Sequence, residues 1–162
     1  MKKRVYIETT IVSYLTAKPS RDLIMAAQQE LTREWWEGRR HRYELYTSQF
    51  VLDEAGDGDP EAARRRLDAL TGLPLLDVPD AAIALAEEMV RRRLLPARAS
   101  ADAVHLAIAT INHVDVLLTW NCRHLANADV HIPVGRFLRS VGYEPPAICT
   151  PNELMGVGNR EE

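Results

Sequence analysis

The chain has 162 residues, of which 46% are apolar and 27% are charged, the balance of a soluble globular domain rather than of a disordered chain. Its 20 basic and 23 acidic side chains give a net charge of −3, which excludes a globally basic nucleic-acid binder. The 2 cysteines exclude a disulfide scaffold, and no apolar run approaches the roughly 18 residues that span a bilayer. The basic start of the chain meets Glu8 too soon for a signal peptide, so we expect a cytoplasmic protein.

The chain alternates between short apolar runs and longer stretches with helical spacing. The short runs predict strands at residues 4–7, 43–47, 73–78, 115–119 and 147–149. The longer stretches predict helices at residues 22–38, 49–55, 60–70, 81–94, 101–112 and 134–141, with one capped turn at 150–154. The expected N-terminal caps are Ser48, Asp59 (followed by Pro60), Asp80 and Ser100. This alternation favours an α/β fold with a parallel sheet.

Four polar side chains follow the predicted strands or begin the predicted helices. Glu8 comes directly after the first strand, and Glu54 lies in the short helix after the second. Asp102 lies in the first turn of the most apolar helix, and Asn121 follows the strand at 115–119. Because ligands gather at the carboxyl ends of parallel strands, we expect these four side chains to converge on one edge of the sheet.

Converging carboxylates raise one another's pKa, and a hard divalent cation relieves their repulsion. Mg²⁺ is usually held by one or two carboxylates, waters and a substrate phosphate, so the pattern indicates metal-assisted hydrolysis of a phosphodiester. Each residue also has a purely structural interpretation. Glu8 then ends a strand in solvent, Asp102 stabilises a helix start, Glu54 is a surface acid and Asn121 is a turn residue.

Other chemistries lack their motifs. The sequence contains no glycine-rich phosphate loop, no serine nucleophile motif and no zinc-ligand spacing, and Cys122 is not expected to act as a catalytic thiolate. Arginine clusters at 39–42, 64–66 and 91–93 have two interpretations, phosphate contacts or the basic ends of helices. Trp35 and Trp36 likewise lie either in the core or in a groove for a partner.

Taken together, the motifs resemble a PIN domain, and more narrowly the VapC-like ribonuclease toxins of type II toxin–antitoxin pairs. The segments that carry the resemblance are 5–10 (VYIETT), 47–54 (TSQFVLDE), 100–109 (SADAVHLAIA), 116–121 (VLLTWN) and 148–154 (ICTPNEL). No single motif is specific, but five of them occur in the right order. The resemblance implies one PIN-like domain at residues 1–155, a three-layer α/β/α sandwich around a five-stranded parallel sheet, with a short tail at 156–162.

The resemblance also implies a site for Mg²⁺ or Mn²⁺ that cleaves single-stranded RNA. Glu54 and Asp102 match the acidic positions of the family. Glu8 stands where the family most often has aspartate, and Asn121 stands where it often has aspartate. We therefore expect Glu8, Glu54 and Asp102 to bind the metal, with Asn121 as the fourth member of the catalytic set.

Hydroxyl hydrogen bonds from Thr10 and Thr119 are expected to support these ligands. The family's usual partners imply an RNA substrate, a homodimer and a neutralising antitoxin, and no membrane. The alternative is a catalytically degenerate PIN-like module that binds RNA or a protein without turnover.

Overall fold

A computed structural model describes residues 1–156 of the chain. Its centre is a five-stranded parallel sheet with the strand order β3-β2-β1-β4-β5. The strands are β1 (Arg4–Ile7), β2 (Glu44–Ser48), β3 (Leu75–Leu76), β4 (Val116–Leu118) and β5 (Ala147–Cys149). The helices are α1 (Thr9–Thr16), α2 (Leu23–Gly38), α3 (Gln49–Ala55), α4 (Pro60–Leu70), α5 (Asp80–Arg91), α6 (Ser100–Ile111) and α7 (Ala128–Ser140). Three short 3₁₀ segments span Arg40–Arg42, Ala97–Ala99 and Pro151–Leu154.

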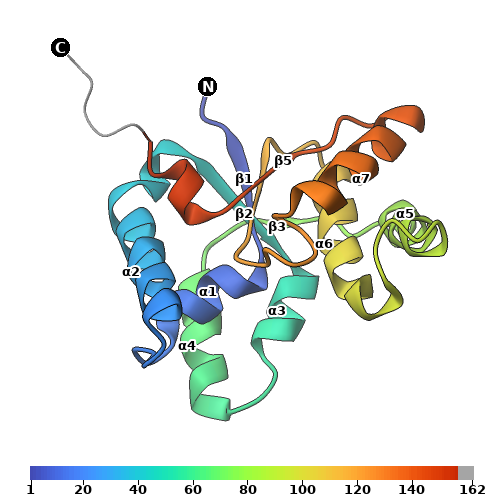
Figure 1. Cartoon of the computed structure of the whole chain (residues 1–162). Coiled ribbons are helices and arrows are strands. Elements are labelled where there is room, and N and C mark those ends of the chain that lie inside the picture. The colour runs from blue at the N-terminus through green and yellow to red at the C-terminus, as the bar shows by residue number, and fades with distance from the viewer. Residues whose placement is uncertain (157–162) are drawn as a thin grey trace.

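Helices cover both faces of the sheet, which confirms the predicted α/β class and the five parallel strands. Figure 1 shows α1, α2 and α4 on one side of the strands and α5, α6 and α7 on the other. The strands β1 and β4 are the most buried, and Val5, Tyr6 and Ile7 of β1 have no exposed surface. Continuous burial on both faces explains why these strands are apolar throughout rather than alternating.

All carboxyl ends of the strands lie at one edge of the sheet because every strand pair is parallel. The backbone N–H of Glu8 donates to the carbonyl of Leu118 at 3.2 Å, so Glu8 continues the ladder between β1 and β4. The start of α1 and the whole of α3 lie at this edge, at the lower side of Figure 1. The strand ends that precede the predicted site residues therefore share one edge of the sheet.

The helix α1 is not among the predicted elements. It starts immediately after Glu8, whose side chain caps it by accepting a hydrogen bond from the backbone N–H of Thr10. Glutamate is not a common N-cap, and the β-branched residues Thr9, Ile11 and Val12 suit a strand better than a helix. Tertiary burial of Ile11 and Val12 outweighs that preference.

Two of the predicted caps are confirmed. The Ser48 hydroxyl accepts from the N–H of Val51 at 3.2 Å, and the Asp59 carboxylate accepts from the N–H of Ala62 at 2.9 Å. Both residues are short polar side chains directly before a helix, the arrangement that satisfies the unpaired N–H groups of the first turn.

Two other caps are wrong. Ser100 lies inside α6 because the 3₁₀ segment Ala97–Ala99 runs directly into the helix, and its hydroxyl makes no capping bond. Asp80 is the first residue of α5, and Pro79 occupies the cap position. The helix predicted from residue 134 begins at Ala128, because Pro133 is accommodated within it.

Trp35 and Trp36 belong to the core, which excludes the partner-groove interpretation. Trp35 is fully buried and Trp36 is 9% exposed, and the Trp35 ring stacks on Tyr43 at 5.8 Å. None of the helices within residues 1–156 is long and apolar enough to cross a membrane. Apart from Gly156, the predicted tail at 156–162 lies outside the described residues.

Candidate active site

Glu8 is a buried carboxylate that is held through one of its two oxygens. Its side chain is 4% exposed. The Oε2 atom accepts hydrogen bonds from the Thr10 backbone N–H at 3.2 Å, from the Thr10 hydroxyl, and from the Thr119 hydroxyl at 2.7 Å. Within residues 1–156 nothing donates a hydrogen bond to Oε1. Thr10 and Thr119 thus donate hydroxyl hydrogen bonds to Glu8, and their support of a metal ligand stays a prediction.

Burial raises the pKa of Glu8 above its usual value. Electrostatic interaction with His105 and the hydrogen bonds from Thr10 and Thr119 oppose that shift without cancelling it. In the described part of the chain, no lysine or arginine forms an ion pair with Glu8. Glu8 is therefore a carboxylate whose negative charge the protein compensates only in part.

Glu54, on α3, is also held through a single oxygen. Its Oε1 atom accepts from the Thr9 hydroxyl at 2.6 Å and lies 2.5 Å from Nε2 of His105. No hydrogen bond from the described residues reaches Oε2. Burial alone would raise the pKa of Glu54, but the hydrogen bond and attraction of His105, together with Thr9, lower it below the usual value.

His105 is a functional candidate that the sequence interpretation missed. It lies on α6, is 1% exposed, and places its Nδ1 atom 2.9 Å from the Tyr6 hydroxyl. That hydroxyl in turn lies 2.8 Å from the hydroxyl of Ser48. The available signal was the position of His105, a single polar ring three residues after Asp102 in an otherwise apolar helix.

Asp102, in the first turn of α6, is engaged at both oxygens. Its Oδ1 accepts from Nδ2 of Asn121 at 2.8 Å, and its Oδ2 lies 3.2 Å from Nδ1 of His124. The side-chain oxygen of Asn121 accepts from the backbone N–H groups of Arg123 and His124, which fixes the orientation of the side-chain amide. The side-chain NH₂ group of Asn121 therefore faces Asp102, and its side-chain oxygen faces the loop.

His124 is a second residue that the sequence interpretation missed. Its Nδ1 atom faces Asp102, while its Nε2 atom is buried without a hydrogen-bond partner among residues 1–156. Its position three residues after Asn121 was the only signal available.

Trp120 anchors the loop that carries Asn121 and His124. Its indole N–H donates to the Thr32 hydroxyl at 2.7 Å, and its ring stacks on Tyr14 at 5.9 Å. Its backbone N–H donates to the Thr10 hydroxyl at 2.9 Å. The loop after β4 is thereby fixed to both α1 and α2.

The hydrogen bonds link the predicted site residues into two groups, one around Glu8 and Asp102 and one around Glu54, and α6 carries a member of each. The backbone N–H of Asn121 donates to the hydroxyl of Thr119, which itself donates to Glu8. Asn121 also contacts Asp102, and one helical turn further along α6, His105 contacts Glu54. The structure thus brings all four predicted side chains to the same edge of the sheet.

Within residues 1–156, no three acidic, histidine or cysteine side chains already form a group that could hold a metal ion. Direct ligation by all of Glu8, Glu54 and Asp102 therefore stays a prediction. The arrangement does offer two glutamates, each with one oxygen held in place and the other without a hydrogen bond in the described chain. Mg²⁺ commonly binds one or two carboxylates and keeps several waters.

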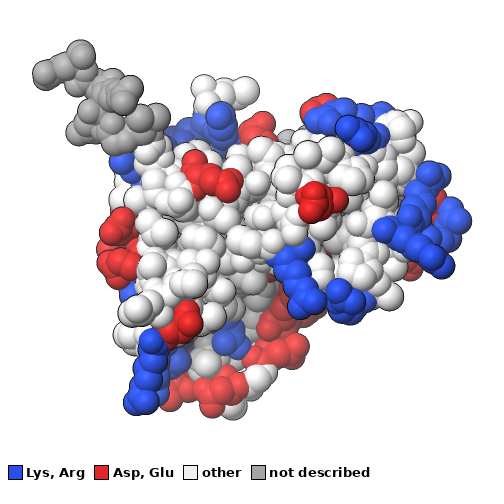
Figure 2. Space-filling model, in the orientation of Figure 1, with Lys and Arg blue, Asp and Glu red and all other residues white. Residues whose placement is uncertain are grey.

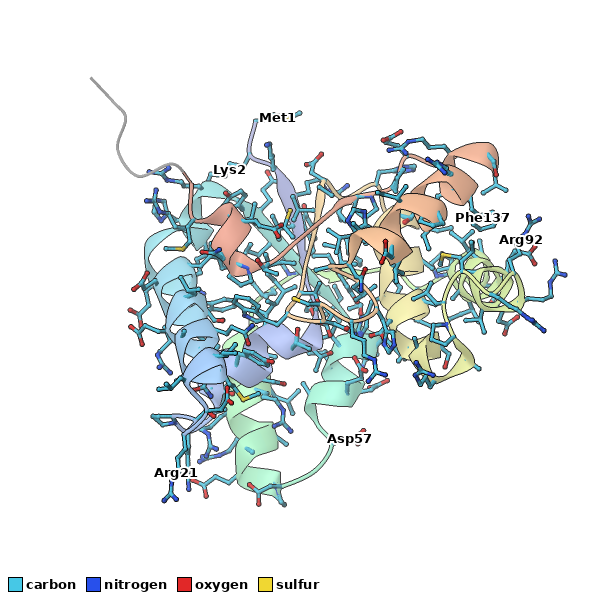
Figure 3. All side chains as sticks on the ribbon, viewed as in Figure 1. Met1, Lys2, Arg21, Asp57, Arg92 and Phe137 are labelled. Carbon is cyan, nitrogen blue, oxygen red and sulfur yellow. The ribbon has the colours of Figure 1, made fainter. Side chains whose placement is uncertain are left out.

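Charged residues around this edge have mixed roles. Figure 2 shows acidic side chains grouped over α3 and α4, and basic side chains grouped around α5. Arg91 and Arg92 both pair with Glu88 of the same helix. Figure 3 labels Arg92 and Phe137, and the Arg92 guanidinium lies 4.8 Å from the centre of the Phe137 ring. These contacts favour the helix-end interpretation of this arginine cluster.

Cys122 does not have the environment of a reactive thiol. Burial, and secondarily the charge of Glu153, raise the pKa of its thiol above the usual value. A catalytic cysteine needs the opposite shift.

Scans against protein-family models and against curated proteins found no match. Among solved structures, the chain is similar to one chain of the crystal structure of VapBC2 from Rickettsia felis bound to a DNA fragment from their promoter. The TM-score is 0.50 at 16% identity, over 91% of this chain and 98% of that chain. The fold is PIN-like. At this identity, the PIN-like fold confirms the resemblance in architecture and leaves the activity to the residues of the site.

Proposed function

We propose that the protein is a Mg²⁺- or Mn²⁺-dependent endoribonuclease that hydrolyses phosphodiester bonds of single-stranded RNA. The observation that carries this proposal is the pair of glutamates at the carboxyl edge of a PIN-like sheet, each fixed through one oxygen. Glu8 is the stronger of the two observations, because it is buried and still has one oxygen unbonded in the described chain.

The residues present suit a hard divalent cation. Glu8 is incompletely compensated in a buried position, and carboxylate oxygens are the ligands that Mg²⁺ and Mn²⁺ prefer. We assign metal binding to Glu8, Glu54 and Asp102, directly or through coordinated water. When bound, the cation supplies Lewis-acid activation of water and of the phosphate.

The remaining residues position these groups. Thr10 and Thr119 hold Glu8, and Asn121 and His124 orient Asp102. Because these positioning groups lie on α1 and in the loop after β4, the site forms only when both segments meet at the sheet edge.

The proposal also includes a toxin role and a protein partner. The similar structure is that of VapBC2 with promoter DNA, and an antitoxin is the partner that such a pair implies. Leu23 and Ile24, at the start of α2, are 85% and 73% exposed, and large exposed apolar side chains mark protein contacts. We propose an antitoxin and a second copy of the chain as partners, in the cytoplasm.

The test is cleavage of a mixed single-stranded RNA pool with Mg²⁺, with Mn²⁺ and with a chelator. We expect metal-dependent cleavage that Asp102→Asn reduces by about 100-fold or more, since the substitution removes a charge but keeps the shape. Asp53→Asn is the matched control, because Asp53 is an exposed acid beside Glu54 whose side chain, among residues 1–156, bonds only Gln49. RNA binding without cleavage by the wild type would indicate the degenerate module instead.

A further inference from the structure

The Tyr6–His105–Glu54 contacts form a chain of hydrogen bonds that runs from the core to the sheet edge. A carboxylate only accepts hydrogen bonds, so Nε2 of His105 is the donor to Oε1 of Glu54 at 2.5 Å. On the other side of the ring, Nδ1 lies 2.9 Å from the Tyr6 hydroxyl. That hydroxyl lies 2.8 Å from the Ser48 hydroxyl, which accepts from the Val51 N–H.

Both ring nitrogens of His105 therefore have partners among the described residues, as do the hydroxyls of Tyr6 and Ser48. The ring is also fixed sterically, since Phe50 packs edge-on against it with the ring centres 4.9 Å apart and His105 is 1% exposed. A histidine held in this way is a rigid donor whose position is determined by β1, β2 and α6.

We propose that His105 is a positioning residue, held by Tyr6 and Ser48, that fixes Glu54 through Oε1 and so leaves Oε2 as the oxygen for a divalent cation. The proposal rests on the metal-dependent function proposed above. The Thr9 hydroxyl reinforces the same oxygen at 2.6 Å, so two donors of different chain segments converge on Oε1. Groups that orient a metal-binding side chain typically change metal affinity about 10–100-fold when removed.

An ordinary core histidine would satisfy its own polar atoms without affecting metal binding. Two substitutions distinguish a positioning role from a purely structural one, because each keeps a polar group near only one of the two ring nitrogens. His105→Gln keeps a donor near the position of Nε2, and His105→Asn keeps only a polar group near Nδ1. Both lose ring packing against Phe50, so a merely structural role predicts similar behaviour for both.

Mn²⁺ affinity, measured by the loss of the free-ion EPR signal, is the deciding readout. We expect His105→Gln to bind Mn²⁺ within about threefold of the wild type, and His105→Asn to bind it about 10–100-fold more weakly. Equal affinities in the two folded variants overturn the positioning role. Absence of Mn²⁺ binding by the wild type overturns the proposed function, and the positioning role with it.

Tyr6→Phe keeps the proposal falsifiable if His105→Asn does not fold, since it removes a single hydroxyl. We expect several-fold weaker Mn²⁺ binding than in Tyr46→Phe, its matched control. Tyr46 pairs with Tyr6 in the register of β1 and β2, but its hydroxyl bonds Glu44 outside the network. Unchanged affinity in Tyr6→Phe counts against the proposal.

A measurement without metal tests the hydrogen-bond order directly. Long-range ¹H–¹⁵N correlation NMR of the metal-free protein should show a proton on Nε2 of His105. A ring with its proton on Nδ1 alone overturns the proposal, whatever the outcome of the metal titration.

Discussion

Glu8 and Glu54 lie at the same edge of one sheet, yet the pKa of the first is raised and the pKa of the second is lowered. Both carboxylates lose water on folding, which disfavours the charged form. Glu54 is less buried, and His105 donates to it, whereas Glu8 receives only hydroxyl and backbone donors. The difference shows that hydroxyl groups can hold a buried carboxylate in place without fully stabilising its charge.

The two glutamates therefore have different roles in the proposed site. Glu54 has its compensating partner within the protein, while Glu8 is the residue whose charge a bound cation would balance. On the proposed function, the bound cation would offset the cost of burying the Glu8 carboxylate at the sheet edge.

The largest expected effect comes from Glu8 itself. Glu8→Gln should reduce metal-dependent RNA cleavage by about 100-fold or more, because it removes the charge that the cation balances. Glu8→Asp should also weaken Mn²⁺ binding, because a shorter side chain cannot keep Oε2 on its donors and leave the other oxygen in place. Cleavage rate against metal concentration measures both effects.

Glu88→Gln serves as the control for this series, since Glu88 lies on α5 and pairs only with Arg91 and Arg92. Activity within a few-fold of the wild type for Glu8→Asp, Glu8→Gln and Glu8→Ala alike would remove Glu8 from the site.

The opposite pKa shifts predict opposite pH dependences of stability in the metal-free protein. Because the folded state binds the Glu8 proton more tightly than the unfolded chain does, stability falls as the pH rises from about 4.5 through the raised pKa. The lowered pKa of Glu54 stabilises the fold above about 4.5, and this contribution is lost as the pH falls through the lowered value.

Urea unfolding from pH 3 to pH 9 measures both slopes. Relative to the wild type, Glu8→Gln should lose the decline towards high pH, and Glu54→Gln should lose the gain above about 4.5. Mn²⁺ should stabilise the wild type increasingly as the pH rises, since the cation binds the ionised carboxylates. Identical pH profiles for the two variants would contradict the comparison.

Removing one hydroxyl donor to Glu8 should have a smaller effect. Thr10→Val and Thr119→Val keep the side-chain shape, and each should weaken Mn²⁺ binding by about tenfold. Thr110→Val is the control, because Thr110 is as buried as Thr119 and donates to the Leu106 carbonyl of its own helix. If all three variants bind Mn²⁺ alike, the hydroxyl donors do not position Glu8.

The smallest effect is expected at the anchor of the loop. Trp120→Phe removes the indole donor to Thr32 while keeping an aromatic ring against Tyr14. We expect a loss of about 1–2 kcal/mol in the free energy of unfolding, with the buried Thr32 hydroxyl left without its donor. Thermal unfolding measures this change, and an unchanged midpoint would show that the bond contributes nothing.

Sequence reasoning predicted the elements whose signals are local. Ser48 and Asp59 are short polar side chains that bond the first turn of their helices, so they identify helix starts without any tertiary information. The failure at α1 has the opposite cause. A glutamate cap and a β-branched first turn give no helical signal, and only burial against the sheet makes the segment helical.

The site residues divide in the same way, into those with a local sequence signal and those without one. Glu8, Glu54, Asp102 and Asn121 could be proposed from the sequence because strand ends and helix starts can be recognised along the chain. His105 and His124 were missed because their partners, Glu54 and Asp102, lie 51 and 22 residues away and the contacts exist only in the folded protein. Hydrogen-bond donors that cross between segments leave no spacing pattern to recognise.

Glu8 is also the residue that caps α1, and this dual position ties the integrity of that helix to occupancy of the site. A ligand that binds Glu8 must slow amide hydrogen exchange in Thr9–Thr16, because opening the first turn releases the carboxylate. By reciprocity, a protein that unwinds α1 would lower the affinity of the site through the Glu8 cap and through the Thr9 hydroxyl that holds Glu54. On the proposed function, local unfolding of this single eight-residue helix would therefore weaken cation binding at the sheet edge.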